Sequence, residues 1–164
     1  MKIALIGYGK MGQAIEEIAV EKGHEIVLKI NIDNTDEFTT ANLQKADVAI
    51  EFTGPHSAVQ NIKAIIDAGV PVVSGSTGWL SEWDGIQQYT LQNDGALLYA
   101  SNFSIGVNLF FELNSYLARL MAKHSDYNVL LEEIHHTQKK MHPVVRPLLW
   151  QKVFYRKFPA KKTG

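Results

Sequence analysis

Residues 132–139, Glu-Glu-Ile-His-His-Thr-Gln-Lys, gather acid–base side chains in one short segment. Histidine exchanges protons near neutral pH, and lysine can act as an acid or bind a carboxylate. His135, His136 and Lys139 are therefore candidates for proton transfer and anion binding. Adjacent residues of a regular strand point to opposite faces, so both histidines could face one ligand only at a strand end or bulge. The alternative is the polar end of a surface strand. A zinc site is disfavoured because no third ligand is apparent, so we expect no metal.

Residues 7–12, Gly-Tyr-Gly-Lys-Met-Gly, form a glycine-rich loop of the pattern Gly-x-Gly-x-x-Gly between a predicted strand and a predicted helix. In dinucleotide-binding loops the first glycine turns the chain, the second lets backbone approach a pyrophosphate, and the third lets helix and strand pack closely. The helix N-terminus adds free N–H groups for the phosphates. We predict binding of NADH or NADPH here; a structural tight turn is the alternative. The expected contacts are Gly7, Gly9, Lys10, Met11 and Gly12.

The acidic residue that commonly binds the ribose hydroxyls of NAD is expected about 20 positions beyond such a loop. Asp33, just past the second predicted strand, could fill this role. A carboxylate there would repel a 2′-phosphate and favour NADH, although Lys10 near the phosphates would soften that preference. On spacing alone a solvated loop aspartate is an equal alternative, and the choice between NADH and NADPH stays open.

Three further segments with small or hydroxylated residues follow predicted strands, at residues 52–55, 75–78 and 101–104. Each segment alone is only a turn. Three of them at the carboxyl ends of parallel strands are typical of a ligand crevice. The candidate contacts that they contribute are Phe52, Thr53, Gly75, Ser76, Thr77, Asn102 and Phe103.

The elements that must position these residues alternate between short apolar runs and helical patterns, which predicts βαβ units with a parallel sheet. The fold class is therefore α/β, with a Rossmann-type sheet followed by the start of an incomplete second α+β domain. A long apolar helical stripe from Leu109 to Met121 and a strand over residues 127–136 mark that second domain. The predicted strands of the sheet are residues 2–6, 25–31, 48–52, 70–74 and 96–100. The predicted helices follow the glycine-rich loop up to Gly23, run from Val59 to Gly69, and span residues 82–91.

Composition excludes several classes of partner. The chain has 164 residues, a formal net charge of −1 and no cysteine. We therefore expect no nucleic-acid or membrane partner, no disulfide framework and no thiolate metal site. The apolar run at the N-terminus is too short for a signal peptide or a membrane span, which favours a cytoplasmic location.

Together these segments resemble the 4-hydroxy-tetrahydrodipicolinate reductase (dihydrodipicolinate reductase) family from residue 1 to residue 140. The glycine-rich loop is shared by many dehydrogenases. The motifs at residues 102–108 (Asn-Phe-Ser-Ile-Gly-Val-Asn) and 133–139 are specific to the family. Two mild departures are Ser76, where threonine is usual, and Ser101, where proline is often found.

The resemblance implies hydride transfer from NADH or NADPH to a cyclic unsaturated dicarboxylate in lysine and diaminopimelate biosynthesis, by a homotetramer. It implies acid–base roles for His135 and Lys139. It implies substrate contacts for His136 and Thr77, and it places Gly75 and the backbone of residues 52–53 against the nicotinamide. A non-catalytic, redox-sensing dinucleotide-binding module is the alternative; such a module would not need the His-His-x-x-Lys segment.

The last stretch, residues 141–164, departs from the family pattern Asp-Ala-Pro-Ser-Gly-Thr-Ala. Restoring one adenine in the lysine codons before Met141 allows that pattern to be read in order, so we interpret this stretch as translated out of frame. A divergent disordered tail is the alternative. The expected domains are residues 1–104 for the dinucleotide, residues 105–140 as the start of a substrate-binding and oligomerisation domain, and residues 141–164 as the tail. We expect an exposed apolar surface, little or no activity in this chain as it stands, and no tetramer without the missing sheet.

Overall fold

The computed structural model describes residues 1–124 and 126–127. The chain divides into two compact units, residues 1–101 and residues 102–164, and each is described here by itself. Apart from Tyr127, the predicted strand over residues 127–136 lies outside the described residues, as do the segment with His135, His136 and Lys139 and the tail from Met141.

The first unit is built on a sheet of five parallel strands in the order β2-β1-β3-β4-β5. This arrangement confirms the predicted α/β fold class with its Rossmann-type sheet. The strands are β1 (Lys2–Ile6), β2 (Glu25–Ile30), β3 (Val48–Glu51), β4 (Val72–Ser74) and β5 (Leu97–Tyr99).

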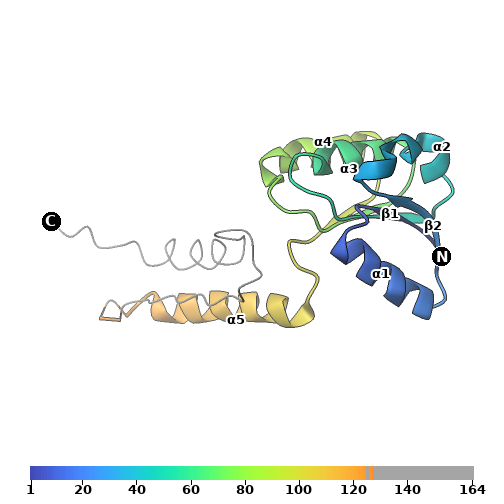
Figure 1. The fold of residues 1–164 in the computed structure, drawn as a ribbon. Coiled ribbons are helices and arrows are strands. Elements are labelled where there is room, and N and C mark those ends of the chain that lie inside the picture. The colour runs from blue at the N-terminus through green and yellow to red at the C-terminus, as the bar shows by residue number, and fades with distance from the viewer. Residues whose placement is uncertain (125, 128–164) are drawn as a thin grey trace. The chain divides into compact units, whose positions relative to one another are not determined.

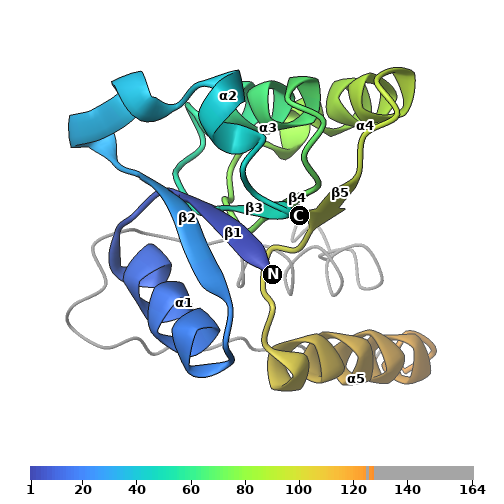
Figure 2. The same ribbon diagram turned by 90° about the vertical axis from the view of Figure 1, so that its right-hand side faces the viewer.

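Helices cover both faces of this sheet (Figures 1 and 2). Helix α1 (Lys10–Glu21) lies on one face, and α2 (Thr40–Leu43), α3 (Ala58–Asp67) and α4 (Trp83–Gln92) lie on the other. Two short 3₁₀ helices, η1 (Ile32–Glu37) and η2 (Leu80–Glu82), complete the connections. Because both faces are covered, the strands read as nearly continuous apolar runs rather than as alternating ones.

Strand β1 shows how the sheet separates two hydrophobic cores. Ala4 and Ile6 point into the larger core under α2, α3 and α4, whereas Ile3 and Leu5 point into the smaller core under α1. Successive side chains of a strand alternate between faces, so one short strand supplies both cores. The apolar positions of α3 fall at helical spacing and complete the larger core with the buried residues Ala58, Ile62, Ile65 and Ile66.

The strands end side by side at one edge of the sheet. The pairing register sets Ile6 beside Glu51, Glu51 beside Ser74, and Ser74 beside Tyr99. The connection that leaves β1 leads to β2 on one side, whereas the connection that leaves the neighbouring strand β3 leads to β4 on the other side. In open parallel sheets such a switch point is where ligands bind, beyond the carboxyl ends of the strands.

Two local features differ from the sequence-based expectations. Strand β4 begins at Val72 rather than at residue 70. Pro71 has no N–H to donate to the neighbouring strand, although its carbonyl accepts a hydrogen bond of 2.9 Å from the amide of Ala49. The elements η1 and α2 were not predicted. Both are short and are fixed by side chains. In α2, for example, the hydroxyl of Thr39 accepts a hydrogen bond from the amide of Asn42 at the start of the helix.

The described part of the second unit is dominated by α5 (Ile105–Met121). The hydroxyl of Ser104 accepts a bond from the amide of Val107, and the Asn108 side chain donates to the carbonyls of Asn102 and Ser104 at 2.9 Å each. The motif at residues 102–108 is thus a helix-start motif. Large apolar side chains on the helix are exposed, for example Leu109 at 65% and Leu113 at 63%. In the described residues no helix has the length and apolar character needed to cross a membrane.

The larger core makes a first prediction about stability. Ile65 is fully buried, whereas Leu91 in α4 is 80% exposed. We expect Ile65→Ala to lower the free energy of unfolding by about 2–5 kcal/mol, because it removes buried methyl groups and leaves a cavity. Leu91→Ala should change that free energy by less than about 0.5 kcal/mol. Urea unfolding followed by circular dichroism measures both; equal effects would contradict the proposed core.

Candidate functional site

The glycine-rich loop after β1 contains two glycines that packing requires. Gly7 has φ +98°, and a Cβ atom there would lie 2.1 Å from the carbonyl oxygen of Phe52. A Cβ atom on Gly12 would lie 2.5 Å from the carbonyl oxygen of Gly7. Only glycine fits at either place without shifting backbone, so these two residues close the turn against β3 and seat α1 against the loop.

Gly9 differs from these two glycines because a Cβ atom there would meet nothing within 4 Å. It is the N-cap residue of α1 and has no side-chain cap, and the first turn of the helix carries no acidic residue. The N–H groups at this helix start therefore remain open to an anion, with the positive end of the helix dipole behind them. The exposed side chains of Lys10 and Met11 flank the same point. A helix N-terminus that is open in this way is a place where proteins can bind a phosphate group.

A buried carboxylate connects the ends of β3 and β4. Glu51 is fully buried and accepts hydrogen bonds from the hydroxyls of Ser74 at 2.6 Å and Ser76 at 2.7 Å. It also accepts bonds from the backbone amide of Thr53 at 2.9 Å and from the Thr53 hydroxyl. A buried charge is tolerated only when such bonds replace those to water. Glu51 thereby holds the loops at residues 52–55 and 75–78 together.

Further contacts fix the same two loops. The hydroxyl of Ser76 accepts a bond of 2.8 Å from the amide of Thr53, and the side chain of Asn61 in α3 donates to the Thr53 hydroxyl at 3.2 Å. The ring of Phe52 lies so close to Gly75 that a Cβ atom there would be 2.1 Å from a ring carbon. A residue larger than glycine at position 75 would therefore displace the ring.

Aromatic residues support the loop after β4. The indole N–H of Trp79 donates to the carbonyl of Ser76 at 2.8 Å. The Trp79 ring packs edge-on against Tyr99 at the end of β5, with ring centroids 5.1 Å apart, and against Trp83 with centroids 5.8 Å apart. Burial raises the pKa of the Tyr99 hydroxyl above its usual range. The end of β5 thus supports the end of β4 through these rings.

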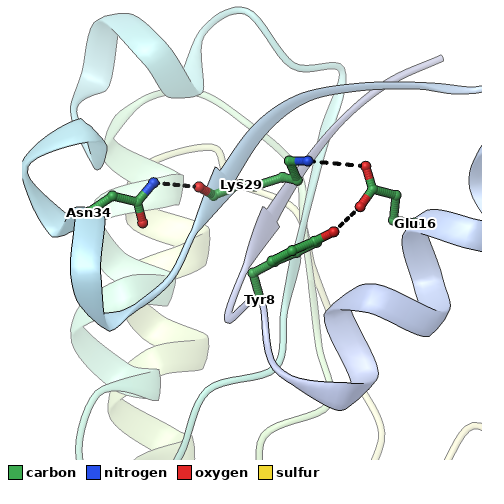
Figure 3. Close-up of polar contacts among 4 residues, drawn as sticks. All are labelled: Tyr8, Glu16, Lys29 and Asn34. Carbon is green, nitrogen blue, oxygen red and sulfur yellow. Dashed lines mark hydrogen bonds and ion pairs between the residues drawn. The ribbon is translucent and has the colours of Figure 1, made fainter.

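An open groove of about 450 Å³ runs along β2, from Ile26 to Lys29, and continues past its carboxyl end. It contains Asp33, the predicted ribose ligand, together with Tyr8 of the glycine-rich loop. Nearby, the hydroxyl of Tyr8 donates to Glu16 of α1, and the Lys29 ammonium lies 3.3 Å from the same carboxylate (Figure 3). The polar residues that line the groove are Tyr8, Lys29, Asn31, Asp33, Asn34 and Glu37.

The first unit thus carries most of the predicted cofactor contacts at the carboxyl edge of one sheet. Asn102 and Phe103 belong to the second unit. Within the described residues, no group of three or more metal-ligating side chains comes together. The first unit carries eleven of the predicted residues on its loops, at the start of α1 and in η1: Gly7, Gly9, Lys10, Met11, Gly12, Asp33, Phe52, Thr53, Gly75, Ser76 and Thr77.

Sequence reasoning missed Glu51 and Glu16. The two-residue period of β3 does place Glu51 on the same face as the buried Ala49, which was an available signal. Besides the neighbouring Thr53, its partners are Ser74 and Ser76, which lie 23 and 25 residues further along the chain, so no local pattern identified these two. Glu16 reads as an ordinary charged residue of an amphipathic helix until Tyr8 and Lys29 are placed beside it.

Comparisons with known proteins point in one direction. The family model described as dihydrodipicolinate reductase, N-terminus, matches residues 1–103. A 4-hydroxy-tetrahydrodipicolinate reductase of Christiangramia forsetii is 49% identical over 141 residues, which cover 85% of this chain and 57% of the relative. A protein of the same name from Staphylococcus aureus is 34% identical over 151 residues, covering 85% of this chain and 58% of the relative.

A solved structure shares the fold. The dipicolinate-bound dihydrodipicolinate reductase from Paenisporosarcina sp. TG-14 superposes with a TM-score of 0.70 at 20% identity, over 100% of this chain and 69% of that one. Compared with the reductases from C. forsetii and S. aureus, the chain spans less than three fifths of the relative's length in each case.

The Glu51 network makes a second prediction about stability. We expect Glu51→Ala to lower the free energy of unfolding by about 2–4 kcal/mol, because buried donors lose their shared acceptor. Glu51→Gln keeps the shape and one carbonyl acceptor, so it should cost about half as much. Glu21→Ala, at an exposed position of α1, is the matched control and should cost less than about 0.5 kcal/mol. Urea unfolding of the three variants measures the order; a loss for Glu51→Ala no larger than for the control would refute it.

Proposed function

Because this chain belongs to the dihydrodipicolinate reductase family, we propose that the complete protein reduces 4-hydroxy-tetrahydrodipicolinate to tetrahydrodipicolinate with NADH or NADPH, in lysine and diaminopimelate biosynthesis. The observation that carries this proposal is the open backbone beside Gly9, at a helix N-terminus and at the switch point of the sheet. A dinucleotide reductase needs such a place for its cofactor.

The residues present fit that cofactor. Gly7 and Gly12 shape the loop, the N–H groups at the start of α1 face the diphosphate, and Asp33 in the groove beside β2 binds the ribose. Gly75 and the backbone of residues 52–53 would hold the nicotinamide; Glu51 fixes these two loops through its bonds to Thr53 and Ser76. A nicotinamide held there would supply the hydride for the reduction.

The substrate side of the site divides between proton transfer and carboxylate binding. Reduction consumes one hydride and one proton, and the hydroxyl of the substrate leaves as water. We assign the proton supply to His135 and Lys139, whose side chains exchange protons near neutral pH or donate them. Thr77 and His136 bind the carboxylates. Asn102 and Phe103 complete the cofactor contacts.

The arrangement of the complete protein follows from the same proposal. Residues 1–104 bind the dinucleotide, and residues 105–140 begin a domain for substrate binding and homotetramer assembly. We assign the stretch from Met141 to a shifted reading frame, because it departs from the family pattern Asp-Ala-Pro-Ser-Gly-Thr-Ala that one further adenine would restore. We place the enzyme in the cytoplasm, where NADH and NADPH are regenerated.

A binding experiment tests whether the cofactor binds beside Gly9. Gly9→Ala adds a methyl group where the protein leaves open space, so we expect an unchanged melting temperature and NADH binding weakened about tenfold or more. Gly85→Ala in α4, where a Cβ atom also meets nothing within 4 Å, is the matched control and should leave binding unchanged. Fluorescence titration with NADH measures both; equal affinities for the two variants would place the cofactor elsewhere.

An activity assay tests whether the in-frame protein reduces the proposed substrate. We expect sequencing through the codons of Lys139 and Lys140 to show one further adenine, and the in-frame product to oxidise NADH in the presence of the substrate. The present chain should bind NADH without turnover. In the in-frame product, His135→Gln should lower kcat about a hundredfold with little change in the Kd for NADH, whereas His124→Gln should not lower it. An in-frame product that binds NADH but never reduces this substrate would favour the non-catalytic alternative.

A further inference from the structure

The described residues that line the groove beside β2 carry more negative than positive charge. Its lining includes two acidic side chains, Asp33 and Glu37, and Lys29 is the single cation among the described residues that line it. The turn η1 that carries both acids is tied to β2, because the side-chain amide of Asn34 donates to the carbonyl of Lys29 at 2.8 Å (Figure 3). This bond from the Asn34 side chain to the backbone of β2 holds the two acids beside the groove.

The one cation of the groove is already engaged. The Lys29 ammonium lies 3.3 Å from Glu16 of α1, and 5.0 Å from the centre of the Tyr8 ring. The hydroxyl of Tyr8 donates to the other oxygen of Glu16, and this bond holds the pKa of the carboxyl below its ordinary value. Glu16 therefore stays ionised at neutral pH and balances the charge of Lys29.

The Lys29–Glu16 ion pair contributes little to the stability of the fold. The Lys29 side chain is 47% exposed and that of Glu16 is 25% exposed, and ion pairs so accessible to water contribute little to folding. The Lys29–Glu16 ion pair can still affect which cofactor binds. The 2′-phosphate of NADPH carries close to two negative charges, whereas the 2′-hydroxyl of NADH carries none. A nearby free lysine would attract that phosphate, whereas a neutralised one leaves Asp33 and Glu37 to repel it.

We propose that Glu16 determines cofactor choice, by holding Lys29 away from a 2′-phosphate and so making this protein prefer NADH to NADPH. The proposal rests on the proposed function, since it requires the ribose of the cofactor to lie at this groove. It assigns the preference to a residue of α1 that is bound through Tyr8, and not to Asp33 alone. Tyr8 acts as a positioning residue that keeps Glu16 directed at Lys29.

The test compares the affinities of the full 164-residue chain for NADH and NADPH by fluorescence titration. Glu16→Gln keeps an acceptor for the Tyr8 hydroxyl but removes the charge. It should tighten NADPH binding about fivefold to twentyfold and change NADH binding by less than about twofold. The fragments 2′,5′-ADP and 5′-AMP, which differ only by the 2′-phosphate, should show the same selective shift in competition.

Two further variants separate this effect from a general change of charge. Glu17→Gln removes one negative charge from the next position of the same helix, where the side chain is exposed, and should leave the ratio of the two affinities within about twofold. Adding Lys29→Gln to Glu16→Gln should abolish the gain in NADPH binding, because the freed cation is then absent.

The outcomes are distinct. If the unsubstituted chain binds NADH and Glu16→Gln does not change the ratio of affinities, or if Glu17→Gln changes it equally, the role of Glu16 is refuted and the proposed function stands. If the unsubstituted chain binds neither cofactor, the proposed function fails and this inference fails with it. An unchanged melting temperature for Glu16→Gln shows that a shift in the ratio does not arise from unfolding.

Discussion

The hydrogen bonds to the carboxylate of Glu51 determine where the chain goes as it leaves β3 and β4. Four donors from Thr53, Ser74 and Ser76 converge on this side chain at the end of β3, where water does not reach it. Since a buried charge is costly unless its bonds to water are replaced, each donor has one favourable position. The loops at residues 52–55 and 75–78 are fixed relative to each other for this reason.

Other close contacts depend on that arrangement. The ring of Phe52 lies over Gly75, and the carbonyl of Phe52 faces Gly7, where only a glycine can stand. The glycine-rich loop, the end of β3 and the end of β4 therefore form one continuous packed edge. A surface packed in this way is preorganised, which reduces the conformational entropy that the protein would lose on binding a ligand.

Charge is distributed unevenly along this edge. The start of α1 presents free N–H groups and Lys10 near the proposed diphosphate position. The groove beside β2 instead carries Asp33 and Glu37, and its one lysine among the described residues is paired with Glu16. One part of the edge is suited to an anion and the next to a neutral sugar, which is the order of groups in NADH. The acid–base residues proposed for the reaction come later in the chain, so cofactor binding and proton transfer belong to separate segments.

The sequence by itself determined the five strands, the glycine-rich loop and the position of Asp33 past β2. It could do so because these features depend on local patterns: apolar runs, helical spacing, and glycines placed between a strand and a helix. Only the tertiary structure decided that Glu51 joins two loops and that Glu16 engages Lys29. Those partners lie 13 to 25 residues apart, and they meet because of strand register and the seating of a helix on the sheet. Such contacts arise from the packing of whole elements, and no local pattern of residue types encodes them.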